Sequence, residues 1–295
     1  MGGVTLGVKL WAEHWWPAPA KLNLMLNVTG QRKNGYHELQ TVFQIIGFSD
    51  WLNFIPTTDG VIKLNCSSKE LQNDENLVVR AATLLQQKSG KDLGVKIELK
   101  KILPMGAGLG GGSSDAATTL LILNEVWELG YSVEELAALG LTLGADVPVF
   151  IWGKSAWAEG VGERLTAIEL PEKWFVVVNS NLHCSTKEVF AHKSLTRDNP
   201  AITIRAFLDG QEDNVCLPVV RQMNQKLDFI YKQFSSFSKV FMTGTGSSLF
   251  AKCESRKQAV TLLNKLPGNW EKWVVKGVSE SPLQKSLKQF LNLLS

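Results

Sequence analysis

Cysteine is scarce in this 295-residue chain, and what there is of it is dispersed. The four cysteines lie far apart, form no Cys-x-x-Cys pair and belong to no Cys/His cluster. Neither a disulfide framework nor a zinc site is therefore expected. Free thiols are typical of a reducing compartment, so the sequence predicts a cytoplasmic protein.

Long apolar runs and blocks of like charge are also lacking. No stretch approaches the roughly 20 apolar residues that a membrane helix needs, and residues 1–16 lack the pattern of a signal peptide. The net charge is only +3, with no cluster of Lys and Arg, which argues against nucleic acid as a partner. We expect a globular protein that acts on a small molecule, as a monomer or a homodimer.

The length and the order of elements predict two domains of an α+β protein. Residues 17–168 carry the strongest motifs and form the first domain. Pro171 and Glu172 mark a break, and residues 169–295 alternate helix, strand, turn, strand, helix and strand, which predicts an antiparallel sheet covered by helices on one face. Residues 1–16, with three tryptophans, are expected to be an N-terminal extension or an edge strand.

The most informative stretch is PMGAGLGGGSS at residues 104–114. A strand is expected before it, at 95–101, and a helix after it, capped by Ser113, Ser114 or Asp115. Such a density of glycine usually lets bare backbone N–H groups approach an anion. The N-terminus of the following helix would add the positive end of its dipole. The stretch predicts a phosphate cradle.

Three well-known phosphate loops do not fit this stretch. A Walker A loop needs Lys after its last glycine, but Gly112 is followed by Ser113. The dinucleotide pattern is present at Gly106, Gly108 and Gly111, yet no acidic residue ends a second strand about 20 residues on. The motifs H-R-D and D-F-G of protein kinases are missing. A cradle for a triphosphate remains.

Other parts of a phosphoryl-transfer site must come from elsewhere in the chain. Residues 19–29 alternate as a strand, with Lys21 and Asn23 on the face opposite its leucines. These two side chains either aim a cation and an amide at one ligand or form the polar face of a strand. Asp146 stands before a predicted strand at 149–152, either as a base or as a turn residue that caps its own backbone.

The remaining periodicities predict ordinary elements. Ser132 and Glu135 match a capping box at the start of a short helix. Further helices are expected at 76–88, 219–237 and 255–265, and further strands at 42–46, 51–55, 174–178, 248–251 and 273–278.

Together these stretches resemble the GHMP family of small-molecule kinases. The central motif of that family, Pro-x-x-x-Gly-Leu-Gly-x-x-Ser-Ser, is similar to residues 104–114. PAKLNLMLNVTGQRKNGYHELQT, GLGGGSSDAA, LTLGADVPVF and AEGVGE resemble, in order, one branch of the family, from about Pro17 to about Gln284. The resemblance implies the two-domain GHMP kinase fold, with an N-terminal ribosomal-protein-S5-like domain and a C-terminal ferredoxin-like domain.

The resemblance also implies an activity. Members of that branch transfer the γ-phosphate of ATP to the 2-hydroxyl of 4-diphosphocytidyl-2-C-methyl-D-erythritol, in the non-mevalonate isoprenoid pathway. By this resemblance Asp146 is the general base and Lys21 assists it. A Mg²⁺ ion is implied, with Ser114 as a candidate ligand and Glu163 as a weaker one.

Two ligand sites follow from the same resemblance. The ATP loop comprises Pro104, Met105, Gly106, Ala107, Gly108, Leu109, Gly110, Gly111, Gly112, Ser113 and Ser114, flanked by Asn76 and Lys101. The substrate contacts are Asn23, Tyr36, His37, Thr186 and Phe190. Tyr36 and Phe190 would stack on the cytosine, whose edge His37 would contact.

Two alternatives stay open. A GHMP kinase could act on another small alcohol, such as homoserine or a mevalonate derivative, but such a substrate has no use for a cytosine clamp at Tyr36 and His37. A non-catalytic nucleotide-binding protein could share the fold, but it would not need Lys21 and Asp146.

Overall fold

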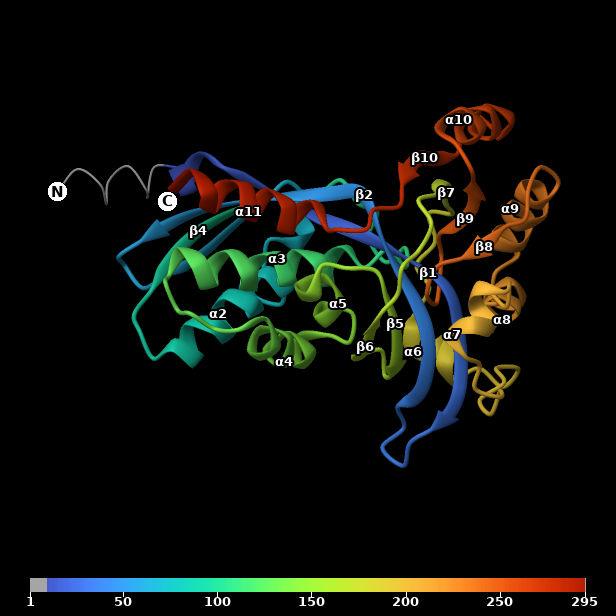
Figure 1. Cartoon of the computed structure of the whole chain (residues 1–295), viewed down its shortest axis with the longest axis horizontal. Coiled ribbons are helices and arrows are strands. Elements are labelled where there is room, and N and C mark those ends of the chain that lie inside the picture. Colours follow the sequence, from blue (N-terminus) through green and yellow to red (C-terminus); the bar gives the residue numbers. More distant parts are fainter. Residues whose placement is uncertain (1–9, 295) are drawn as a thin grey trace.

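The computed structural model describes residues 10–294, which form two β-sheets with helices packed around them (Figure 1). The first sheet comprises β1 (Trp15–Gln31), β2 (His37–Thr57), β3 (Ile62–Cys66), β4 (Gly94–Lys100), β5 (Ala156–Gly160) and β6 (Arg164–Ala167). The second comprises β7 (Trp174–Asn179), β8 (Phe241–Met242), β9 (Leu249–Cys253) and β10 (Glu271–Lys276). The predicted α+β class is confirmed.

The first sheet is built around the long strand β2. β1 pairs with β2 along its length, while β4 and β5 pair with different parts of the same strand. Every pairing is antiparallel except that of β3 with β4. Helices α2 (Leu77–Ser89) and α3 (Gly111–Val126) pack on this sheet, and α4 (Val133–Leu143) and α5 (Val147–Trp152) pack on these two helices. Their apolar side chains and those of the sheet form one core.

The second sheet is antiparallel throughout, in the order β10-β7-β9-β8. The short helices α6 (Thr186–Ala191) and α7 (Ile204–Leu208) follow β7, and α8 (Cys216–Met223), α9 (Gln225–Ser235) and α10 (Arg256–Lys265) complete this part. Residues of α8, α9 and α10 share a second core with one face of the sheet. The expected antiparallel sheet with helices is thus present.

A third apolar cluster joins the two sheets. Phe175, Val177 and Phe250 from the second sheet pack with Leu22 and Leu24 of β1. The cluster also contains Leu103, Ala107 and Leu109 from the glycine-rich loop. The loop therefore lies where the two halves of the molecule meet, a common place for a ligand site.

The end of the chain returns to the first sheet. Helix α11 (Pro282–Leu294) contacts β1, and its Phe290 packs at 4.4 Å from Trp11 and 5.1 Å from Trp16, measured between ring centroids. Trp15 and Trp16 begin β1 rather than precede it, while residues 1–9 lie outside the described part. The domain division at residue 168 stays a prediction, with α11 packed across it.

Several local expectations are wrong. Residues 149–152 belong to α5 and form no strand. The strands expected at 42–46 and 51–55 are one continuous β2, and the helix expected at 219–237 is divided at Asn224 into α8 and α9. The capping box is confirmed, because Ser132 accepts from the Glu135 amide and Glu135 accepts from the Ser132 amide.

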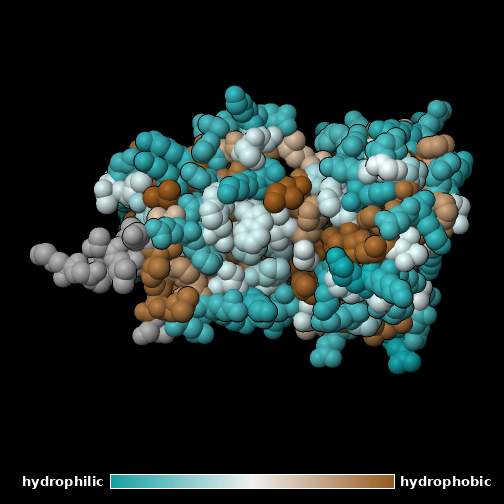
Figure 2. Space-filling view, turned by 90° about the horizontal axis from the view of Figure 1, so that it is seen from above, coloured by the Kyte–Doolittle hydropathy of each residue, from teal (hydrophilic) through white to brown (hydrophobic). Residues whose placement is uncertain are grey.

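Within residues 10–294, none of the helices combines the length and the apolar character required to cross a membrane. Figure 2 shows the side that carries α11, on which hydrophilic residues predominate and hydrophobic ones gather in small, separate areas.

Candidate active site

The glycine-rich loop leads directly into α3. The N-cap of this helix is Gly110, and the Ser114 amide makes the first helical hydrogen bond, of 2.9 Å, to the Gly110 carbonyl. The prediction that Ser113, Ser114 or Asp115 caps the helix is therefore wrong, since the helix begins inside the glycine run. The amides of residues 111–113 have no acceptor within the helix and form its positive end. This arrangement suits a phosphate.

Glycine is required at two positions of this loop by its close contacts. Gly108 and Gly110 have φ angles of 77° and 75°, which other residues resist. A Cβ on Gly108 would lie 2.4 Å from the Thr243 carbonyl oxygen, and one on Gly110 would lie 2.9 Å from the Phe150 ring. The loop thus packs too tightly to carry side chains at these points.

Hydrogen bonds fix the loop between the two halves of the molecule. The Leu109 carbonyl accepts from the Lys21 amide at 3.0 Å, and the Ala107 carbonyl accepts from the Ser248 amide at 3.0 Å. The Thr243 hydroxyl donates to the Gly108 carbonyl at 2.9 Å. The cradle is therefore held by β1 on one side and by the turn between β8 and β9 on the other.

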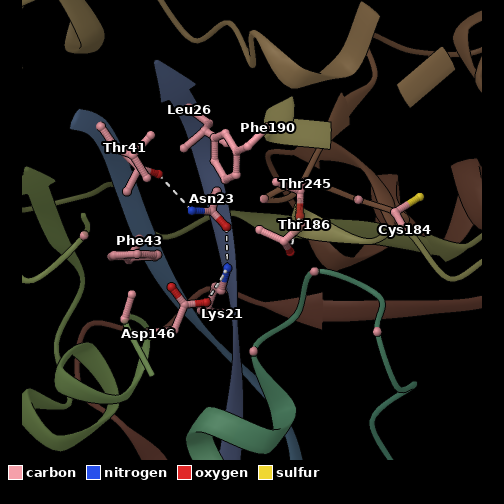
Figure 3. A pocket seen from close by; sticks show the side chains of 18 of the residues that line it. Lys21, Asn23, Leu26, Thr41, Phe43, Asp146, Cys184, Thr186, Phe190 and Thr245 are labelled. Carbon is pink, nitrogen blue, oxygen red and sulfur yellow. Dashed lines mark hydrogen bonds and ion pairs between the residues drawn. The ribbon is translucent and has the colours of Figure 1, made fainter. Parts of the chain in front are cut away.

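Lys21 and Asp146 lie together beside this loop. The Lys21 ammonium is 3.2 Å from Asp146 Oδ2, and it also donates to Asn23 Oδ1 (Figure 3). Asp146 is the N-cap residue of α5, but its side chain makes no capping hydrogen bond. The carboxylate is 34% exposed, whereas the Lys21 side chain is 4% exposed. Of the two interpretations of Asp146, the structure favours a carboxylate that faces a ligand site.

Asn23 is oriented by its neighbours. Its Nδ2 donates to Thr41 Oγ1 at 2.9 Å, and Thr41 donates in turn to the Met25 carbonyl at 2.6 Å. The backbone amide of Asn23 donates to Thr243 Oγ1 at 3.0 Å. These bonds keep the Asn23 carbonyl oxygen on Lys21, which also lies 5.4 Å from the centroid of Phe43.

A cavity of about 420 Å³ opens between the pair and the second half of the molecule. Figure 3 shows Lys21 and Asp146 at one end of it and Phe190 at the other. Thr186, at the start of α6, shares a 2.9 Å hydrogen bond with Thr245 of the β8–β9 turn. A ligand in this cavity would contact both the Lys21–Asp146 pair and Phe190.

The aromatic end is formed by residues from both halves. His37, at the start of β2, stacks on Phe190 of α6 with ring centroids 4.8 Å apart and planes at 18°. His37 Nε2 is buried and has no hydrogen-bond partner among the described residues. Burial, together with the nearby Arg197 guanidinium, lowers the pKa of His37, which favours the neutral imidazole. Tyr36 lines the same side but is largely exposed.

A second cavity, of about 400 Å³, lies on the other side of the loop. The predicted nucleotide contacts Asn76 and Lys101 both line it, but both side chains have other partners. Asn76 caps α2, with Oδ1 accepting from the Val78 amide at 2.9 Å and Nδ2 donating to the Leu71 carbonyl at 2.8 Å. The Lys101 ammonium is held by the carboxylates of Asp50 and Asp115.

Asp50, Lys101 and Asp115 form a buried triad that holds both ends of the cradle. Asp50, on β2, accepts from the amides of Ile102 and Leu103, which precede the loop, at 2.5 and 2.8 Å. Asp115 is in the first turns of α3 and lies 2.8 Å from the Lys101 ammonium. Burial raises the pKa of Asp115 to about 7. Asp115 thus holds its proton to a higher pH than an exposed Asp would.

The two candidate metal ligands, Ser114 and Glu163, differ in whether their side chains already have hydrogen-bond partners. Ser114 Oγ is fully buried in the first turn of α3 and has no partner in residues 10–294. Glu163 accepts from the Val161 amide at 2.6 Å and so is committed to its own turn. No group of three or more His, Cys, Asp and Glu in the described part of the chain could hold a metal ion. Ser114 thus has an unpartnered oxygen but lines neither cavity, whereas Glu163 is already bound within its own turn.

Comparisons with known proteins agree with this geometry. The family model described as GHMP kinases N terminal domain matches residues 76–154. A 4-diphosphocytidyl-2-C-methyl-D-erythritol kinase of Nitrosococcus oceani is 50% identical over 274 residues, covering 93% of this chain and 98% of the relative. One of the same name from Pseudomonas aeruginosa is 46% identical, covering 92% and 96%. The chain belongs to the GHMP kinase family. It is a small-molecule kinase.

Solved structures confirm the GHMP kinase fold. A 4-(cytidine 5'-diphospho)-2C-methyl-D-erythritol kinase structure matches with a TM-score of 0.79 and 33% identity, covering 90% of this chain and all of that one. A homoserine kinase from Cytophaga hutchinsonii matches with a TM-score of 0.67 at 14% identity, which shows the fold alone.

Some residues of the site had no signal in the sequence. His183 packs over the loop, because a Cβ on Gly106 would lie 2.7 Å from His183 Nδ1. Thr41 and Thr243 bond to Asn23, and Phe43 lies beside the Lys21 ammonium, each from another segment of the chain. Such residue types occur in every core, so only the fold identifies them as parts of the kinase site.

Proposed function

We propose that this kinase transfers the γ-phosphate of ATP to the 2-hydroxyl of 4-diphosphocytidyl-2-C-methyl-D-erythritol. The observation that carries the proposal is the position of the Lys21–Asp146 pair between a phosphate cradle and a cavity with an aromatic end. The relatives of that name, at 46% and 50% identity over almost the whole chain, supply the choice of substrate.

In this proposal Asp146 is the general base. Its partly exposed carboxylate lines the cavity, where it would accept the proton of the substrate hydroxyl as that oxygen attacks phosphorus. Lys21 orients Asp146 and supplies a positive charge beside the alkoxide and the transferred phosphoryl group. Asn23 and Phe43 hold the lysine in this position.

The loop at residues 104–114 would bind ATP. The free amides of the first turn of α3 and the glycine contacts described above fit the phosphates. Asn76 and Lys101 would border the nucleotide on the far side of the loop. Ser114 would contact Mg²⁺, which neutralises phosphate charge when it is bound.

The other end of the cavity would hold the nucleobase. His37 covers one face of Phe190, so a planar base would stack on the remaining face, and Tyr36, which lines the same cavity, would be a second stacking partner. The unpartnered Nε2 of His37 is a hydrogen-bonding atom that a pyrimidine edge could satisfy. Thr186 and Asn23 would line the path between the base and the reacting hydroxyl.

The proposal is tested by incubating the purified protein with ATP and Mg²⁺ and measuring the release of ADP. The diphosphocytidyl substrate should support turnover, whereas homoserine and mevalonate should give only the background rate. Turnover on homoserine or mevalonate without turnover on the diphosphocytidyl compound would overturn the assignment. The cytoplasmic location and the choice between monomer and homodimer stay predictions from the sequence.

A further inference from the structure

The segment 192–203, between α6 and α7, crosses from the second half of the molecule to the first. The amide and the side chain of Asn199 both donate to the Val28 carbonyl of β1, at 3.1 and 3.2 Å. Asn27 Nδ2 donates to the Pro200 carbonyl at 2.9 Å. Ile202 exchanges two hydrogen bonds with the Gln40 side chain of β2, at 2.9 and 3.1 Å. This strap is therefore anchored on β1 and β2.

Arg197 connects the strap to the end of α6. Its guanidinium donates to three backbone carbonyls: Phe190 at 2.7 Å, His192 at 2.8 Å and Leu195 at 3.1 Å. A cation is favourable beside carbonyls that a helix end leaves unpaired, and hydrogen bonds from a charged donor are stronger than neutral ones. The backbone of Phe190 is thereby tied, through Arg197, to a strap that is fixed on the first domain.

The link through Arg197 is important because the two rings at the aromatic end of the cavity come from different halves of the molecule. His37 belongs to β2 and Phe190 to α6, yet their rings stack at 4.8 Å. α6 has only six residues and one fully buried side chain, Val189, so its own packing constrains it weakly. Arg197 also lines the cavity that Tyr36, His37 and Phe190 share.

We infer that Arg197 is a positioning residue for substrate selection: it holds Phe190 against His37 and so sets the space available to a nucleobase. The inference rests on the proposed function, because it concerns the nucleobase end of the same substrate. It predicts that Arg197 affects binding of the diphosphocytidyl substrate and leaves phosphoryl transfer and ATP binding alone, since the cradle and the Lys21–Asp146 pair lie elsewhere.

Lysine can replace arginine in this role only in part. Three carbonyls in different directions match the planar fork of a guanidinium, whereas an ammonium group offers a single nitrogen atom. Arg197→Lys should therefore keep the charge but lose part of the effect. Arg205→Met is a matched control, because Arg205 is an exposed residue of α7 whose guanidinium pairs with Asp209.

The test is a steady-state comparison of the wild type, Arg197→Met, Arg197→Lys and Arg205→Met. Arg197→Met should raise the KM for the diphosphocytidyl substrate about tenfold, toward the lower end of the range for base–aromatic stacking. The kcat of Arg197→Met and its KM for ATP should stay within a factor of two of the wild type. For the diphosphocytidyl substrate, the KM of Arg197→Lys should lie between those of the wild type and Arg197→Met. Arg205→Met should behave as the wild type.

A double-mutant cycle shows whether Arg197 acts through Phe190. In a Phe190→Ala background, Arg197→Met should add little to the KM, because the ring that it positions is gone. An unchanged KM in Arg197→Met, equal and additive effects in both backgrounds, or a parallel loss of kcat and ATP affinity in both Arg197 variants would overturn the inference. Absence of turnover by the wild type would instead overturn the proposed function, and this inference with it.

Discussion

Lys21 of β1 and Asp146 at the start of α5 form an ion pair of 3.2 Å in which the ammonium is buried and the carboxylate is partly open. This difference in exposure between the two groups suits them to different chemical roles. The buried ammonium, held by Asn23 and Asp146, places a positive charge at the site, while a partly exposed carboxylate can accept a proton from a bound hydroxyl group.

Replacement of this carboxylate is the first prediction. Asp146→Asn keeps the shape of the side chain but removes the proton acceptor, so kcat should fall by about 10²- to 10⁴-fold. The KM for ATP should change little, because the cradle does not include this side chain. Asp209→Asn, on the exposed end of α7, should retain full activity. Wild-type kcat in Asp146→Asn would remove this residue as the base.

The second prediction concerns the glycine loop. Gly108→Ala places a Cβ 2.4 Å from the Thr243 carbonyl oxygen and 2.9 Å from that of Gly246, at a φ of 77°. The left-handed conformation alone costs about 1–2 kcal/mol, and the contacts add to it. Gly108→Ala should therefore lower the unfolding free energy and raise the KM for ATP. Gly268→Ala, where a Cβ meets nothing within 4 Å, should change neither quantity.

The third prediction concerns Phe190. Phe190→Ala should raise the KM for the diphosphocytidyl substrate by about 5- to 150-fold, if stacking contributes the ~1–3 kcal/mol typical of base–aromatic contacts. The value of kcat should be nearly preserved, since Phe190 is at the opposite end of the cavity from Asp146 (Figure 3). Phe229→Ala, an exposed aromatic of α9, is the control. A large loss of kcat at an unchanged KM would refute a role in binding.

The fourth prediction is a dependence of stability on pH. Burial raises the pKa of Asp115 to about 7, while an unfolded Asp titrates near 4. Between about pH 4 and 7 the folded state thus binds more protons than the unfolded state, so this group's contribution to stability falls as the pH rises through that window. Asp115→Asn should remove this fall, measured by urea unfolding at pH 5 and 7.5. An equal fall of the unfolding free energy in the wild type and in Asp115→Asn would show that other groups cause it.

The local parts of the fold were predictable from the sequence. β1, α2, β4 and the capped start of α4 have clear periodicity or a known cap. The helical structure of residues 147–152 was not predictable, because a short apolar run fits a strand or a buried helix equally well. The true cap of α3 was also missed, since a glycine cap has no side-chain signature.

The motif residues of the site were predictable from the sequence, but the residues that hold them in place were not. Lys21, Asn23, Asp146 and the loop stand in recognisable patterns, and the structure brings them together. The triad of Asp50, Lys101 and Asp115 depends on a strand pairing that no local pattern encodes. The same holds for Arg197, whose partners are backbone carbonyls, because every residue type supplies one.

The central claim is the transfer of phosphate to one particular hydroxyl group, and the identity of the product tests it most directly. The protein should convert ATP and 4-diphosphocytidyl-2-C-methyl-D-erythritol into ADP and a product with one additional phosphomonoester. Phosphorus NMR with correlation to the carbon skeleton should place that ester on the 2-hydroxyl. A phosphate on another hydroxyl, or ADP release without a phosphorylated diphosphocytidyl product, would contradict the account.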